Sequence, residues 1–136
     1  MKNIIIIMVS LTFALIIASC DCRIESQEED ALFNIWVNYD DDFSAPVTLK
    51  SSNKFDHYHP GFEIRSDGEF IERKNSGWCG TPPIAYANYS GVWEKISADT
   101  LEITVEYWGG IENYKIEILS VDENELLINY VYSHEE

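Results

Sequence analysis

The chain has 136 residues and a formal net charge of −15, and it is 46% hydrophobic and 13% aromatic. This length accommodates one domain and leaves no room for a catalytic domain with a second module. The aromatic content excludes a disordered chain and predicts a packed core. The acidity argues against binding to nucleic acid or to anionic lipid headgroups, so any charged partner should be basic.

The first nineteen residues are organised like an export signal. Lys2 is followed by an almost wholly apolar run, residues 4–17. A run of about 14 apolar residues is shorter than the roughly 20 that a membrane-spanning helix needs, and it is typical of a secretory signal peptide. We therefore expect residues 1–19 to be removed, which takes away one positive charge and leaves the chain at −16.

The end of this segment, Ile17-Ala18-Ser19-Cys20, resembles the bacterial lipobox, in which an aliphatic residue and two small residues precede a cysteine. The resemblance implies cleavage before Cys20 and acylation of that cysteine. It also implies export and anchoring in the bacterial cell envelope, in either leaflet, with the acyl chains on Cys20 holding the protein to the membrane. The alternative is an ordinary signal peptide in which Cys20 has no role.

The residues that follow predict a tether. Residues 20–30 are acidic and non-periodic, which indicates a flexible, solvated segment before a single domain over residues 31–136. Cys22 and Cys79 could form a disulfide bond outside the cytoplasm, which would join this tether to the domain. The alternative is two free thiols, because a disulfide needs Cα atoms within about 7 Å.

The remaining chain reads as strands separated by turns, and no segment has a helical period over ten or more residues. The clearest alternation is in residues 101–107, where apolar side chains share one face. Asp67-Gly68 between two alternating runs is a strong hairpin signal. The expected strands are residues 33–39, 47–50, 61–65, 69–73, 91–96, 101–107, 114–118 and 126–132.

This pattern predicts an all-β fold in which an antiparallel up-and-down meander of about seven or eight strands closes into a small barrel. Closure is favoured because it removes exposed sheet edges. A two-layer β-sandwich is the alternative.

Residues 75–83 (NSGWCGTPP) interrupt the strand rhythm, because two glycines and two prolines exclude a strand or helix there. Trp78, at the centre, either plugs one end of the barrel or is an exposed binding element. We expect the plug, since exposing a tryptophan costs transfer free energy.

Residues 61–132 resemble the small lipocalin-like lipoproteins of bacteria. The resemblance implies an up-and-down barrel, a small apolar ligand and no catalysis. Asn34-Ile35-Trp36 departs from the Gly-x-Trp that the first strand of that family usually carries. The features that carry the resemblance are the hairpin from Phe62 to Phe70, Tyr89-Ser90-Gly91-Val92-Trp93 leading to Asp99-Thr100-Leu101, and the closing pair Tyr114-Lys115-Ile116 and Leu126-Leu127-Ile128.

The sequence gives little support for an enzyme or a metal site. No nucleophile elbow, phosphate loop or HExxH sequence is present, and the acids are expected on outward strand faces, so we expect no enzyme and no cofactor. His57 and His59 would share a face on a strand, but zinc needs further ligands, so a solvated loop is expected. The acids at 40–42 lack the glycine and later acid of a calcium loop, which favours a charged turn.

Two functional hypotheses of different classes remain. In the first, the barrel of a monomer binds a small apolar or aromatic ligand. In the second, the acidic domain binds a basic protein, as some small anchored bacterial barrels inhibit lysozyme. A hollow barrel would favour the first, whereas a filled barrel, with the aromatic residues as core, and a protruding 75–83 loop would favour the second. The candidate ligand-binding residues are Phe62, Phe70, Trp78, Trp93 and Tyr107.

Overall fold

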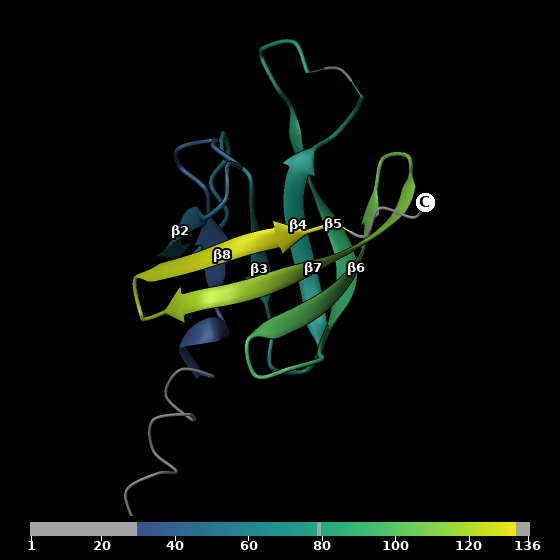
Figure 1. Cartoon of the computed structure of the whole chain (residues 1–136). Helices are drawn as coiled ribbons and strands as arrows, with labels where there is room; N and C mark the ends of the chain where they lie inside the picture. Colours follow the sequence, from purple (N-terminus) through teal and green to yellow (C-terminus); the bar gives the residue numbers. More distant parts are fainter. Residues whose placement is uncertain (1–29, 79, 133–136) are drawn as a thin grey trace, which may run out of the picture. The chain divides into compact units, whose positions relative to one another are not determined.

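The computed structural model describes residues 30–78 and 80–132. The chain divides into two compact units, Met1–Asp30 and Ala31–Glu136, and the description below concerns the second. Residues 30–32 are helical, and the other regular elements of the described residues are strands (Figure 1). The strands are β1 (Ile35–Val37), β2 (Val47–Ser52), β3 (Gly61–Ile64), β4 (Glu69–Asn75), β5 (Tyr86–Lys95), β6 (Thr100–Tyr107), β7 (Gly110–Val121) and β8 (Glu125–Val131).

The strands form one closed antiparallel barrel, in the order β1-β2-β8-β7-β6-β5-β4-β3. The prediction of an all-β barrel is thereby confirmed. From β3 to β8 each strand pairs with the next one along the chain. At the point of closure β1 lies between β2 and β3 and pairs antiparallel with both, while β2 pairs with β8. Strands β2 and β3 therefore run parallel to each other, and residues 53–60 connect them past β1.

The two ends of this barrel carry different connections. One end, which we call the loop end, carries residues 38–46, 76–85, 108–109 and 132. The other end carries residues 30–34, 65–68, 96–99 and 122–124. Figure 1 shows the 76–85 loop projecting from the loop end, and the helical turn where this unit begins at the other end. The first residues of the barrel unit are thus far from its longest loop.

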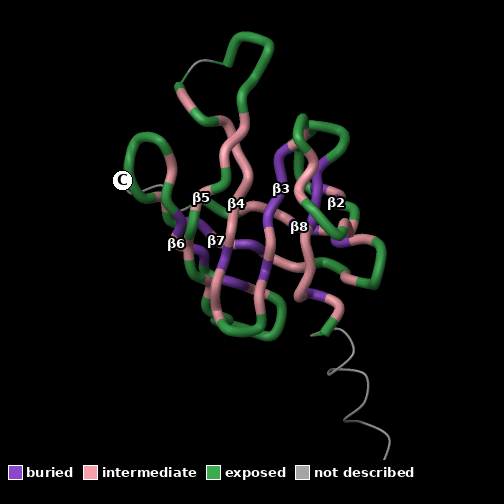
Figure 2. The backbone as a smooth tube through the Cα atoms, turned by 180° about the vertical axis from the view of Figure 1, so that it is seen from behind, coloured by how far each residue is buried: buried purple, intermediate pink, exposed green. Residues whose placement is uncertain are grey.

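Side chains of the barrel's own strands form a buried apolar core, and Figure 2 shows the buried stretches along those strands. Trp36 has no exposed surface, and its indole Nε1 donates to the Leu32 carbonyl oxygen at 3.0 Å. The rings of Phe62 and Phe70 stack with centroids 5.3 Å apart. Phe62 and Phe70 are therefore core residues, as the filled-core alternative expects, whereas Trp93 and Tyr107 are only partly buried. The buried core cluster is Leu32, Trp36, Val47, Leu49, Phe62, Ile64, Phe70, Leu101, Ile103, Val105, Tyr114, Ile116, Leu126 and Ile128.

The predicted hairpin at Asp67-Gly68 joins β3 and β4. Gly68 has a φ of 90°, a left-handed conformation that glycine adopts without a steric penalty. The Asp67 carboxylate accepts a hydrogen bond from the Glu69 N–H at 3.0 Å, which closes the turn. Local turn chemistry therefore fixes the register of β3 on β4.

Gly61 offers a test of the closure through β1. A Cβ atom at this position would collide with the Trp36 carbonyl oxygen, whereas a Cβ at Gly77 would meet nothing within 4 Å. We therefore expect Gly61→Ala to lower the free energy of unfolding by about 1–3 kcal/mol, because β1 and β3 must separate. Gly77→Ala, as control, should change it by less than about 0.5 kcal/mol.

Urea denaturation of both variants measures the two changes. Equal stability of Gly61→Ala and the native chain would contradict the close approach of β3 to β1.

Candidate functional site

The five residues predicted to bind a ligand are not brought together. Phe62 and Phe70 lie in the core. Trp93 is partly buried and donates from its indole Nε1 to the Arg65 carbonyl oxygen at 2.8 Å, close to the end opposite the loop end. Only Trp78 and Tyr107 belong to the loop end. Cys20, Cys22 and Cys79, predicted to be acylated or paired, lie outside the described residues.

The prediction that Trp78 plugs the barrel is wrong. Its side chain is 82% exposed, in the loop that connects β4 and β5. The physical reason is that Leu32 and side chains of the strands already form the apolar core, so the interior is packed without the Trp78 indole. An exposed tryptophan on a projecting loop is typical of a recognition element.

Exposed apolar side chains gather at the same end. Ile111 is 66% exposed at the start of β7, Phe43 is 55% exposed between β1 and β2, and Tyr132 is 53% exposed after β8. Trp108, in the turn between β6 and β7, is 52% exposed. Exposed apolar surface that is concentrated in one region, beside acidic residues such as those at 40–42, is a mark of an interaction surface.

At the loop end of the barrel interior, reaching up to this surface at Tyr132, lies a layer of polar and aromatic side chains that we call the mouth cluster. Strand alternation places it on the inward face, above the apolar core. Glu72 is two residues from buried Phe70, and Glu112 is two residues from buried Tyr114. The mouth cluster is Glu72, Lys74, Tyr89, Tyr107, Glu112, Tyr114, Tyr130 and Tyr132.

Lys74 is at the centre of the mouth cluster. Its Nζ lies 2.9 Å from a carboxylate oxygen of Glu72 and 2.9 Å from one of Glu112. The same Nζ is 5.9 Å from the ring centroid of Tyr89 and 5.7 Å from that of Tyr107. Two carboxylates and two aromatic faces thus surround one ammonium group.

The prediction that the acids lie on outward strand faces is therefore wrong for Glu72, whose side chain is only 15% exposed. It holds for Glu102 and Glu106 of β6, which are exposed. Alternation from Phe70 would have placed Glu72 and Lys74 inward. The sequence pattern therefore predicted that Glu72 and Lys74 face inward. It could not show that Glu112 and the tyrosines lie next to them.

Burial controls the electrostatics of the mouth cluster. Desolvation raises the pKa of Glu72, and the attraction of Lys74 opposes this rise without cancelling it. Burial also raises the pKa of Tyr114, well above its usual range. The Tyr114 hydroxyl is near the Glu72 carboxylate but makes no hydrogen bond of ordinary geometry. A carboxylate held in this way attracts positive charge strongly, because the surrounding dielectric is low.

One hollow, of about 380 Å³, opens beside the mouth cluster. Its walls combine the charged groups of Lys74 and Glu112 with the apolar surfaces of Tyr107, Trp108 and Ile111, and Asn75 completes the lining. The volume falls in the lower part of the range for ligand-binding pockets.

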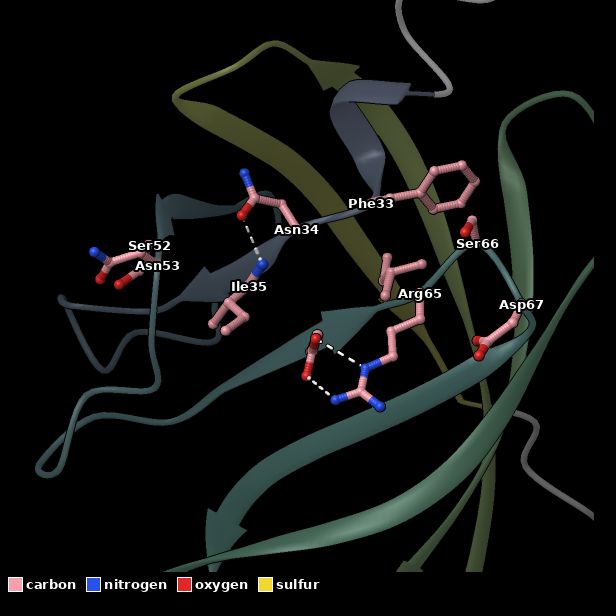
Figure 3. Close-up of a pocket in the computed structure, with 10 residues that line it drawn as sticks. Phe33, Asn34, Ile35, Ser52, Asn53, Arg65, Ser66 and Asp67 are labelled. Carbon is pink, nitrogen blue, oxygen red and sulfur yellow. Dashed lines mark hydrogen bonds and ion pairs between the residues drawn. The ribbon is translucent and has the colours of Figure 1, made fainter.

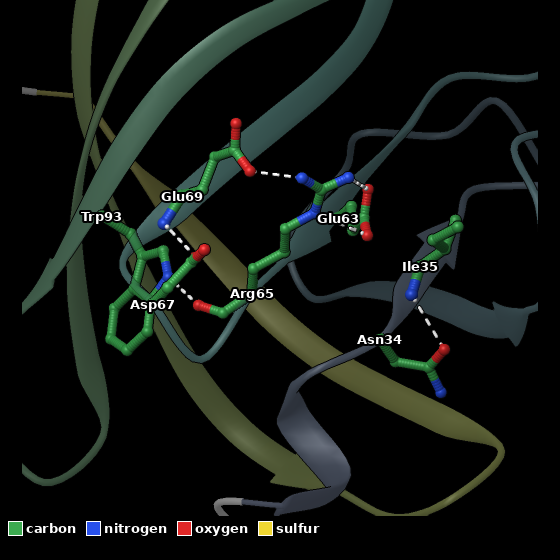
Figure 4. A network of polar contacts seen from close by, with 7 residues as sticks. All are labelled: Asn34, Ile35, Glu63, Arg65, Asp67, Glu69 and Trp93. Atoms are coloured by element: carbon green, nitrogen blue, oxygen red, sulfur yellow. Dashed lines mark hydrogen bonds and ion pairs between the residues drawn. The ribbon is translucent and has the colours of Figure 1, made fainter.

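A second hollow, of about 490 Å³, lies at the opposite end of the barrel (Figure 3). Its Arg65 donates to the Glu63 carboxylate at 2.9 and 3.1 Å and also pairs with Glu69, as Figure 4 shows. Asn34 and Asp67 likewise accept hydrogen bonds from neighbouring backbone N–H groups. Because these groups are engaged in holding the turn, this hollow offers a ligand less than the one beside the mouth cluster.

The histidines of residues 53–60 lie in the irregular connection between β2 and β3, as predicted for a loop. The Nδ1 atom of His59 is 3.5 Å from a carboxylate oxygen of Asp41. Asp42 accepts a hydrogen bond from the Ser44 N–H at 2.8 Å, which is the geometry of a charged turn. Within residues 30–78 and 80–132, no three His, Cys, Asp or Glu side chains are grouped as metal ligands.

Over the same described part of the chain, no helix has both the length and the apolar character that crossing a membrane requires. Comparison with known proteins gives no match, whether to a family model, to a curated protein or to a solved structure.

Glu72 predicts a distinctive pH dependence. Its pKa is raised above the ordinary value of 4.5 in the folded chain, so the folded state holds this proton more tightly than the unfolded state does. Ionisation of Glu72 therefore lowers stability as the pH rises through the interval above 4.5. Glu72→Gln removes this ionisation, so the variant should gain stability relative to the native chain as the pH rises above 4.5.

Urea denaturation of both chains at several pH values measures the difference in free energy of unfolding. A difference that stays constant or falls with rising pH would contradict the burial of an ionisable Glu72.

Proposed function

We propose that this chain is a bacterial lipoprotein of the cell envelope whose barrel is a non-catalytic scaffold that binds a basic protein through its loop end. The observation that carries the proposal is the combination of a filled interior with a projecting, 82% exposed Trp78. A small apolar ligand inside the barrel would have to displace core side chains that have almost no exposed surface. The filled core therefore favours recognition on the outside.

The composition supports a basic partner. The chain carries 24 acidic residues against nine lysines and arginines. Such an excess accelerates encounter with a positively charged surface and repels acidic proteins. The aromatic side chains of the loop end would then supply the buried contacts that charge alone does not provide. A cationic enzyme such as a lysozyme is one partner with this chemistry.

The arrangement of the barrel suits a protein held by its N-terminal segment. The barrel unit begins at the end opposite the loop end (Figure 1). An anchor on Cys20 would be connected to the barrel unit through the chain that enters it at Ala31. The lipocalin-like relationship is supported by the consecutive pairing from β3 to β8, which is that of an up-and-down barrel.

The contact at Trp78 is tested by a photoreactive amino acid placed at position 78 in the native host. Leu119, 46% exposed on β7 and away from the loop end, is the control position. We expect a cross-linked basic protein from position 78 only. With the purified partner, Trp78→Ala should weaken binding about tenfold or more, and Leu119→Ala less than about twofold.

Raising the salt concentration should weaken the same complex, because the charged surfaces are screened. No cross-link from position 78, identical cross-links from both positions, or an acidic partner would each overturn the proposed function.

The lipid anchor has its own test. We expect Cys20→Ser to lose all labelling by an alkyne fatty acid and to leave the signal peptide uncleaved, because the acylated thiol is gone. Cys22→Ser, two residues away, should be labelled as fully as the native chain. A labelled Cys20→Ser variant would show that the fatty acid is attached elsewhere.

A further inference from the structure

The mouth cluster holds more negative than positive charge. Lys74 is shared by Glu72 and Glu112, so one carboxylate charge remains uncompensated within the cluster. The two acids differ in access, since the side chain of Glu72 is 15% exposed and that of Glu112 is 39% exposed. An incoming group would therefore reach Glu112, while Glu72 keeps Lys74 in place.

The groups around Lys74 show that the mouth cluster is suited to binding a cation. Carboxylate oxygens at 2.9 Å and tyrosine ring centroids at 5.7 and 5.9 Å form the kind of environment that binds a cation in proteins. The chain fills part of this environment with its own ammonium group. The uncompensated negative charge is accessible from the adjoining hollow, because Glu112 also lines that hollow.

The residues that line the hollow point to a long side chain with a planar charged end. Besides Glu112, the lining includes Tyr107, Trp108 and Ile111, and Trp108 is 52% exposed. Apolar walls suit the methylene stem of a basic side chain. An indole and a carboxylate together suit a guanidinium, which stacks on aromatic faces and pairs with carboxylates through two N–H groups.

We propose that the hollow beside Lys74 receives an arginine side chain of the basic partner, with its guanidinium on the Glu112 carboxylate and its stem along Trp108 and Ile111. This inference rests on the proposed function for its source of arginine. It adds a second contact to Trp78, inside the rim of the barrel, and it explains why an acidic residue and an exposed tryptophan share the hollow.

The test uses the full chain in detergent micelles and a small probe, N-acetyl-arginine methylamide. The readout is the indole N–H signal of Trp108 in NMR spectra, assigned by Trp108→Phe because the chain has four tryptophans. We expect a saturable shift with the arginine compound. The citrulline analogue, which has nearly the same shape without the charge, should give no saturable shift, because the charge carries the recognition.

Glu112→Gln should weaken binding of the arginine compound about fivefold or more. Glu106→Gln, which removes the same charge from the exposed outer face of β6, is the matched control and should change the affinity less than about twofold. Because Glu112 is partly exposed, its replacement should leave the fold intact, which the remaining tryptophan signals report.

Equal shifts from arginine and citrulline compounds, or unchanged affinity in Glu112→Gln, would overturn the arginine site. The two proposals fail separately. A partner cross-linked through position 78 whose binding ignores Glu112→Gln would leave the proposed function standing without the arginine site. A Glu112-dependent arginine response without any cross-link at position 78 would do the reverse.

Discussion

Closure of the sheet through the three-residue strand β1 is the constraint on which the rest of the structure depends. β1 pairs with β2 on one side and with β3 on the other, and no other described strand joins these two. Trp36, at its centre, is fully buried, and Gly61 approaches its backbone closely. Once this short strand completes the circle, each side chain on the eight strands faces either the interior or the outside.

That division explains both the stability and the chemistry of the interior. Its middle is apolar and packed, so the barrel holds itself together without a ligand. Its upper layer contains buried Glu72, whose charge needs a counter-charge, and Glu112, which is 39% exposed and is also solvated by water. Lys74 supplies that counter-charge for one of them, and the tyrosine rings complete its surroundings. The pairing with Lys74 thus neutralises the buried carboxylate of Glu72 and leaves one negative charge in excess in the mouth cluster.

Much of the fold could be predicted from local patterns. The alternation in residues 101–107 and the Asp67-Gly68 turn identified strands and a hairpin that the structure contains. The place of β1 between β2 and β3 could not be predicted, because strand pairing across the closure depends on long-range contacts that periodicity does not encode. The plug expected of Trp78 failed for a related reason, since transfer free energy alone does not show whether the core has room.

The candidate site was harder to predict than the fold. The aromatic residues chosen as ligand contacts include Phe62 and Phe70, which pack the core, because a large apolar side chain gives the same sequence signal in either role. The mouth cluster draws on β4, β5, β6, β7 and β8. Only the register of the closed sheet shows that these positions meet in one layer.

The hairpin of β4 and β5, whose connecting loop contains Trp78, affects the free energy of binding a partner. β5 pairs with β4 along its upper part, from Tyr86, but pairs with β6 only from Gly91 onward. Two strands alone are marginally stable, so residues 86–88, next to the loop, can open locally while the barrel stays folded. A partner that binds the 76–85 loop must therefore offset the conformational entropy lost when this hairpin is ordered, and the barrel beneath it contributes almost nothing to that loss.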